Sequence, residues 1–142
     1  MTSPIADLLL CVVVGISDGD TITARCTEQT VKIRLAEIDA PEKRQAFGAR
    51  AKQSLSALCY GKQAEIRPQT HDRYGRMVAR VSCAGQDAST AQIEAGMAWV
   101  YRKYSTAPTL PPLEAQARAA SRGLWADPIP TPPWEWRRMP RH

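Results

Sequence analysis

The chain has 142 residues, of which 44% are hydrophobic, so it is long enough to bury one core as a single domain. It carries 19 Lys and Arg residues against 14 Asp and Glu residues, a formal net charge of +5. This charge favours a polyanionic partner, although it would also serve solubility alone. No stretch reaches the ~18 consecutive apolar residues of a membrane span, so we expect no membrane association. The longest apolar run, residues 8–14, predicts a strand rather than a signal peptide.

The first half of the chain predicts five short strands and one helix. Apolar or alternating segments rich in β-branched residues, bounded by turn chemistry, indicate the strands. These segments are residues 8–16, 21–26, 31–35, 63–67 and 77–83. Residues 17–20 join the first two strands as a hairpin. Before the fourth strand, apolar residues recur at helical spacing from Phe47 to Cys59, and Gly61 stands where a helix cap is expected.

The second half predicts two further helices and an extended tail. A short helix passes through residues 91–93 and ends at Gly96, and a third helix spans residues 113–124. Prolines, tryptophans and arginines dominate residues 128–142, a composition typical of an extended segment. We therefore expect one folded domain over residues 8–127, followed by this tail.

The four cysteines are spread singly along the chain, with only two histidines to accompany them, which does not match a zinc site. Cys11 and Cys26 lie nearly opposite each other on the predicted hairpin, so a cross-strand disulfide is expected there. Cys59 and Cys83 would form the second pair, although four buried free thiols remain the alternative. Two disulfides would indicate an oxidising compartment, and we expect a periplasmic or secreted protein.

Four carboxylates fall in two short loops. Asp18 and Asp20 occupy the hairpin turn, where a tight turn alone would also favour them. Asp39 and Glu42 follow the third strand, where a slip in the apolar pattern predicts a bend. The proline after Ala40 holds the chain extended, so that the Ala40 carbonyl can face a ligand. Hard cations such as calcium prefer carboxylate and carbonyl oxygens, so the two loops are a candidate metal site.

Two arginines accompany these acids. Arg34 lies on the polar face of the third strand, and Arg76 closes a polar turn that also holds Arg73 and Tyr74. A guanidinium stays charged at any working pH and fits phosphate oxygens with a planar fork. Each arginine alone would be interpreted as a solvated surface charge, so only their combination with the acids indicates phosphate chemistry.

Three blocks together resemble, in order and spacing, the signature motifs of the staphylococcal nuclease (thermonuclease-like) family. They are Asp18-Gly19-Asp20-Thr21, Arg34-Leu35-x-x-Ile38-Asp39-x-Pro41-Glu42 and Asp72-Arg73-Tyr74-Gly75-Arg76. The resemblance covers about residues 11–127. It implies a mainly β fold with helices, namely a five-stranded oligonucleotide/oligosaccharide-binding (OB) barrel with three α-helices.

The same resemblance implies a calcium site and catalytic groups. Asp20 and Asp39 would bind Ca²⁺ through their side chains and Ala40 through its backbone carbonyl, with Asp18 supporting the site from behind. The implied catalytic residues are Glu42, Arg34 and Arg76. Glu42 would contact or orient the attacking water, and the two arginines would bind the phosphate and stabilise its developing charge. The implied substrate contacts are Arg73, Tyr74 and Tyr104.

The chain departs from the family pattern at three points. The link over residues 43–46 is much shorter than the mobile loop of the best-known member, so substrate access is expected to differ. Ala40 replaces a threonine, a change that keeps the backbone carbonyl. Arg102 stands where the family has one of two nucleotide-stacking tyrosines.

These features predict a monomeric, calcium-dependent nuclease that cuts phosphodiester bonds of DNA or RNA, and that cuts internally. A catalytically silent nucleic-acid-binding barrel is the alternative, but such a module has no physical need for four acids facing a polyanion. A third interpretation is an interaction protein that docks through the segment 131–136.

Overall fold

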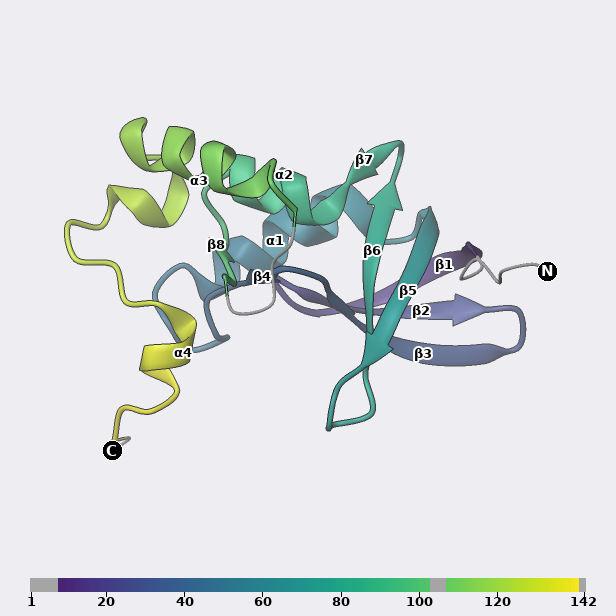
Figure 1. Ribbon diagram of the computed structural model, residues 1–142. Helices are drawn as coiled ribbons and strands as arrows, with labels where there is room; N and C mark the ends of the chain where they lie inside the picture. Colours follow the sequence, from purple (N-terminus) through teal and green to yellow (C-terminus); the bar gives the residue numbers. More distant parts are fainter. Residues whose placement is uncertain (1–7, 103–106, 141–142) are drawn as a thin grey trace.

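Five strands close into a barrel in the computed structural model, which describes residues 8–102 and 107–140. The barrel strands are β1 (Leu9–Asp18), β2 (Thr21–Cys26), β3 (Gln29–Leu35), β5 (Gln63–His71) and β6 (Met77–Cys83). They pair antiparallel in the order β3-β2-β1-β5-β6, and a parallel pairing of β3 with β6 closes the sheet on itself. The five-stranded barrel expected from the sequence is confirmed (Figure 1).

Strand β1 is apolar on both faces, although only one face is buried. Cys11 and Val13 are buried, whereas the alternating residues Leu10, Val12 and Val14 are 44–57% exposed. Register shifts against β2 follow Val13 and recur before the end of the strand. Such irregularities bend a strand and re-aim its side chains, and here they lie just before the hairpin turn that carries the first two acids.

Three helices pack together on one side of the barrel (Figure 1). They are α1 (Gly48–Cys59), α2 (Ala88–Glu94) and α3 (Leu110–Ala119). The buried positions of α1 follow helical spacing and include Ala51 and Leu55, as the sequence pattern predicts. Helix α2 begins where the Asp87 side chain accepts a hydrogen bond from the backbone N–H of Thr90.

Short strands complete the fold around the barrel. Strand β4 (Ile38–Asp39) pairs antiparallel with β8 (Trp99–Val100), and β7 (Gln86–Asp87) extends the sheet beside β6. The bend predicted before Asp39 is present, with Glu37 in the left-handed region at φ 73°. Strand β4 thereby leaves the direction of β3 and carries Asp39 toward the hairpin turn.

The third helix differs from the predicted span of 113–124. Helix α3 begins earlier, at Leu110, because prolines occupy its first turn, where no backbone N–H is needed for the helix. It ends at Ala119, since Ser121 takes a left-handed φ of 53°. The following residues form a separate 3₁₀ helix, η1 (Gly123–Ala126).

The C-terminal tail was expected to be extended, and this expectation is wrong for part of it. Residues Pro133–Trp136 form a short helix, α4, which Figure 1 shows in yellow, away from the free end of the hairpin β2–β3. The Trp134 ring lies 5.6 Å from the Trp99 ring of β8. Burial of aromatic surface against the domain therefore outweighs the extended preference of the prolines.

Both predicted disulfides are present. Cys11 pairs with Cys26 across the hairpin, with 4.4 Å between their Cα atoms, and Cys59 of α1 pairs with Cys83 of β6 at 5.3 Å. No cysteine is left free, and all four lie in the described part of the chain. The second bridge fastens the first helix to the barrel wall.

Over residues 8–102 and 107–140, none of the helices combines the length and the apolar character that crossing a bilayer requires.

Candidate active site

The two acidic loops meet beside helix α1. Asp20 is 5% exposed and Asp39 is 1% exposed. The hairpin turn that holds Gly19 and Asp20 packs tightly against α1 and the Asp39 loop. A Cβ added to Gly19 would lie 2.6 Å from the Cβ of Ala51 and 2.8 Å from that of Ala40. The absence of a side chain at Gly19 therefore lets the two loops and the helix approach each other.

Hydrogen bonds fix the Asp20 carboxylate in this contact. Its Oδ2 accepts from the backbone N–H of Ala40 at 2.7 Å, and its Oδ1 accepts from the hydroxyl of Thr21 at 3.0 Å. Asp18 supports the turn, since its Oδ1 accepts from the N–H of Asp20 at 3.1 Å. Buried Gln92 of α2 donates to the carbonyl of Gly19 at 2.8 Å. Residues that are far apart in sequence thus orient one carboxylate.

Arg34 joins the two loops through its guanidinium. Its Nη2 donates to Asp39 Oδ1 at 3.3 Å, and its Nη1 lies 3.5 Å from Asp20 Oδ2. The same Nη1 donates to the carbonyls of Leu35 and Ile38 at 2.9 and 2.7 Å, which fastens the bend between β3 and β4. The side chain is only 13% exposed, so these contacts are made largely out of water.

Burial and charge shift the titration of the acids in opposite directions. Burial, followed by the nearby charge of Asp20, raises the pKa of Asp18 from 3.8 to about 7. Burial also raises the pKa of Asp39 from 3.8 to about 6, although Arg34 opposes that rise. Burial alone would raise the pKa of Asp20, but Arg34 and the hydrogen bonds to its oxygens outweigh it and lower that pKa. Asp20 therefore stays ionised beside two carboxyls that hold protons more readily.

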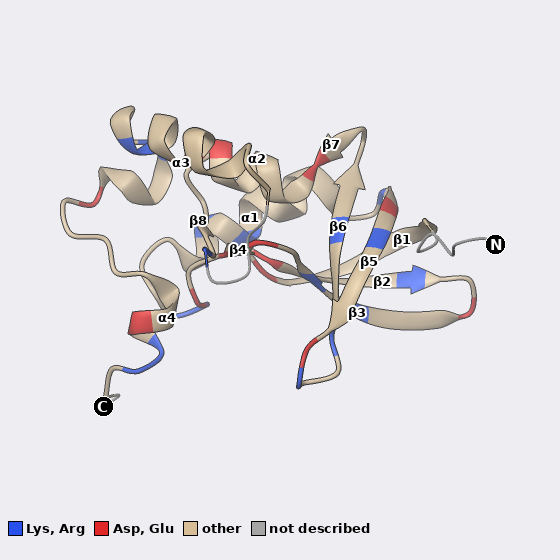
Figure 2. Cartoon of the chain, viewed as in Figure 1, with Lys and Arg blue, Asp and Glu red and all other residues tan. Residues whose placement is uncertain are grey.

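Glu42 lies at the open side of the site and is paired with a residue of the tail. Arg137 donates from Nη1 to Glu42 Oε2 at 3.1 Å and from Nη2 to Asp39 Oδ2 at 2.6 Å. Figure 2 shows acidic segments around β4 and basic segments just after α4. Sequence reasoning missed Arg137, and the only signal that could have pointed to it is the content of arginine and tryptophan in the tail.

The chemistry of this donor set fits a hard divalent cation. Four carboxylates face two guanidiniums, those of Arg34 and Arg137, so negative charge is in excess. Burial is the main cause of the raised pKa values of Asp18 and Asp39, and the nearby charge of Asp20 adds to the rise at both. Within the described residues, no group of three or more His, Cys, Asp or Glu side chains is arranged to hold a metal. Two carboxylates and the Ala40 carbonyl, completed by water, are the available ligands.

The third sequence block forms the turn between β5 and β6. Arg76 is held by Asp72, with Nε donating to Oδ2 at 2.7 Å, and its guanidinium lies 5.6 Å from the centre of the Tyr74 ring. Arg73 lies over the same ring at 5.2 Å, and Tyr74 is 70% exposed. The structure thus gathers Arg73, Tyr74 and Arg76 in one turn, where both guanidiniums lie against the Tyr74 ring, and none of the contacts described for them reaches Asp20, Asp39 or Glu42. Tyr104 lies outside the described residues.

Known proteins match the chain over most of its length. The family model described as staphylococcal nuclease homologue matches residues 32–127, more than half of the chain. The chain belongs to the staphylococcal nuclease family. The family assignment made from the three sequence blocks is confirmed, and the nuclease-family barrel carries two of these blocks around Arg34 in one buried cluster.

Similar proteins are named as nucleases. An "Uncharacterized endonuclease" of Escherichia coli O157:H7 is 44% identical over 126 residues, which are 88% of this chain and 82% of that protein. An "Uncharacterized endonuclease" of Haemophilus influenzae is 45% identical over 130 residues, 91% of this chain and 73% of the other. The "Micrococcal nuclease" of Shigella flexneri is 40% identical over 141 residues, 92% and 81% of the two chains.

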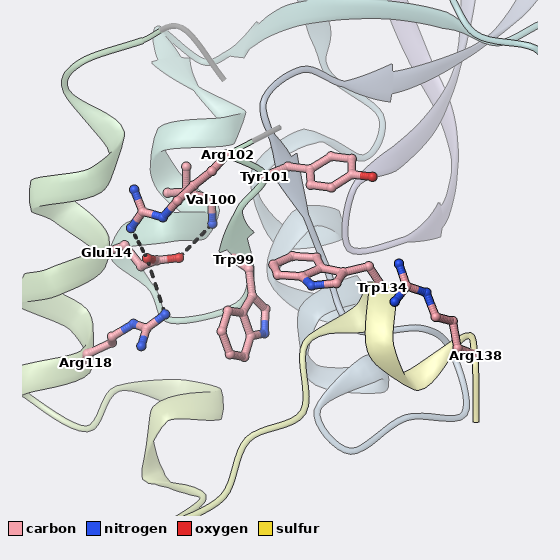
Figure 3. Close-up of a pocket in the computed structure, with 8 residues that line it drawn as sticks. All are labelled: Trp99, Val100, Tyr101, Arg102, Glu114, Arg118, Trp134 and Arg138. Carbon is pink, nitrogen blue, oxygen red and sulfur yellow. Dashed lines mark hydrogen bonds and ion pairs between the residues drawn. The ribbon is translucent and has the colours of Figure 1, made fainter. Parts of the chain in front are cut away.

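Beside the acids, this nuclease-family chain has a pocket of aromatic and cationic side chains (Figure 3). Trp134 of α4 stacks on Tyr101, with 5.6 Å between ring centres and 19° between planes. Buried Glu114 also lines the pocket, where it accepts from the N–H of Val100 at 2.7 Å and pairs with Arg102. Helix α4 therefore packs against the domain through Trp134, which lines this pocket.

Proposed function

We propose that the protein is a calcium-dependent nuclease that hydrolyses phosphodiester bonds of DNA or RNA within the strand. The observation that carries the proposal is the buried cluster in which Arg34 contacts both Asp20 and Asp39. A binding barrel gains nothing from burying acids opposite a polyanion, whereas a metal-assisted hydrolase needs them. The names of the relatives support hydrolysis rather than binding alone.

The residues divide the reaction between them. Asp20, Asp39 and the Ala40 carbonyl would hold Ca²⁺, which when bound polarises the scissile phosphate. Glu42, 34% exposed at the side chain, faces the open side, where it orients the attacking water. Arg34 offers its planar charge to the phosphate as negative charge develops on the oxygens.

Arg76 contributes from the turn between β5 and β6. Its ion pair with Asp72 is partly exposed, with 31% of the Arg76 side chain open to solvent, so a phosphate can compete for the guanidinium. Arg73, exposed Tyr74 and Tyr104 are proposed substrate contacts, through charge and through stacking on bases. The positive side chains would attract the nucleic-acid substrate, while the acids hold the metal.

The test separates metal binding, water activation and charge stabilisation. Asp20→Asn should weaken calcium affinity, and added calcium should partly restore cleavage. Glu42→Gln should bind calcium and substrate yet cleave slowly. Arg76→Ala should lower the rate by about 10²–10³-fold with a smaller effect on substrate affinity.

The substrates of this test are single-stranded DNA, duplex DNA and RNA, each with calcium or with a chelator. Lys32→Ala provides a control, because Lys32 is exposed on β3 and hydrogen-bonds only Ser17 among the contacts described for its side chain. Equal cleavage in chelator, or full activity in all three site variants, would leave a silent nucleic-acid-binding barrel as the better explanation.

We also propose that the protein works in an oxidising compartment, as a periplasmic or secreted monomer. The two disulfides support this, because such bridges persist where thiols are not kept reduced. Fractionation of cells that express the full-length natural protein, followed by detection with an antibody, tests the location.

A further inference from the structure

We propose that Arg137, delivered by the C-terminal segment, is a positioning residue that holds the Glu42 carboxylate beside Asp39 for catalysis. The proposal rests on the nuclease function proposed above and adds to it a residue outside the three sequence blocks. It makes the segment 131–137 a part of the active site.

The segment is docked at three points, so Arg137 does not reach the acids by chance. Thr131 accepts a hydrogen bond at its carbonyl from Gln45 Nε2 at 2.6 Å. Pro133 is buried, and Trp134 packs edge-on against Trp99 while it stacks on Tyr101 (Figure 3). Aromatic contacts of this kind are worth about 0.5–1.5 kcal/mol each beyond the area they bury. Helix α4 is thereby fixed one turn before Arg137.

The segment holds Glu42 twice, through its backbone and through its side chain. Gln45 accepts from the N–H of Glu42 at 3.0 Å with Oε1 and donates to Thr131 with Nε2, so one amide links the Glu42 backbone to the tail. Arg137 meets the Glu42 carboxylate directly at 3.1 Å. A residue that must orient a water needs its own rotamer fixed, and here the Arg137 contact restrains the Glu42 side chain while the Gln45 link holds its backbone.

Arg137 also completes the support of Asp39. One oxygen of Asp39 faces Arg34 at 3.3 Å and the other faces Arg137 at 2.6 Å, so the carboxylate is held from both sides. Asp39 and Glu42 are like charges, and a guanidinium between them removes the repulsion that would turn the exposed Glu42 side chain away.

The segment has a second arginine that serves as a matched control. Arg138 is exposed and adjoins Arg137, but no ion pair to an acid is found for it within the described residues. Arg137→Ala and Arg138→Ala each remove one positive charge from the same segment. Arg137→Lys keeps the charge but not the planar fork that spans two carboxylates.

The experiment measures kcat and KM on a labelled single-stranded DNA at saturating calcium, together with calcium affinity by calorimetry and thermal unfolding. We expect Arg137→Ala to lower kcat by about 10- to 100-fold with KM little changed, as for other residues that orient a catalytic group. Calcium should bind at least as tightly, because a cation beside Asp39 has been removed. Arg137→Lys should recover part of kcat, and Arg138→Ala should keep the full value.

Three results would overturn the role of Arg137. The first is an unchanged or higher kcat in Arg137→Ala, which would show that the segment is dispensable or inhibitory. The second is a loss of calcium affinity in Arg137→Ala that accounts for its slower rate. The third is an equal loss of kcat in Arg138→Ala. If the unmodified protein itself cleaves nothing, the nuclease proposal fails instead, so the two failures are distinguishable.

Discussion

Arg34 is predicted to contribute to stability as well as to catalysis, and the unfolding of Arg34→Ala measures the contribution to stability. The side chain is 13% exposed and contacts two carboxylates and two backbone carbonyls. Removing one partner of a buried ion pair leaves the other charge unpaired, at a cost of about 3–5 kcal/mol. Water that enters the vacated space would rebind the two carbonyls, so no further cost is added for them. Against a typical stability of about 5–15 kcal/mol, the variant should fold but with a small margin.

The assay is urea denaturation at neutral pH in chelator, followed by circular dichroism. Lys32→Ala is the matched control, because Lys32 lies on the same strand and exposes its ammonium, which meets only the Ser17 hydroxyl at 3.0 Å among its described contacts. A surface change of this kind should alter stability by about 0.5 kcal/mol or less. Calcium should then restore stability to Arg34→Ala, since the unpaired acids gain a cation. If Arg34→Ala proves no more destabilising than Lys32→Ala, the cluster is solvated and the reasoning from burial is refuted.

The disulfides, the shifted pKa values and the charge of the surface each lead to a further prediction. Alkylation and mass spectrometry of the unreduced protein should show no free thiol, and four labelled thiols would contradict the two disulfides. The double variant Cys11→Ser, Cys26→Ser should lower the free energy of unfolding by about 3 kcal/mol. Because burial raises the pKa of Asp18 to about 7, the folded state retains a proton that the unfolded chain releases, so Asp18 reduces stability increasingly as pH rises from about 4 to about 7. The advantage of Asp18→Asn over the unmodified protein should therefore grow across that range in chelator, and a constant difference would show that Asp18 is solvated. Affinity for single-stranded DNA should fall steeply between about 50 and 200 mM salt, and insensitivity to salt would assign the binding to stacking on Tyr74 instead.

Local sequence patterns were sufficient for the five barrel strands and the first helix. Alternation in β3 predicted its buried face, because neighbouring strand residues point to opposite sides whatever the fold. The pairing of Cys11 with Cys26 was predicted from their nearly opposite positions on one hairpin, and the two register shifts between β1 and β2 bring them into line. The three motif blocks were enough to assign the family, which the matches to known proteins confirm.

Tertiary structure decided what depends on the path of the chain over long separations. The closure of the barrel by β3 and β6, and the pairing of β4 with β8, join segments that no local pattern relates. Arg137 meets Glu42 across 95 residues of sequence. An arginine in a proline- and tryptophan-rich tail has the same local signature whether it is solvated or seated on an acid. Only the docking of Trp134 against the domain decides between the two, because burial of its ring determines where the following residues lie.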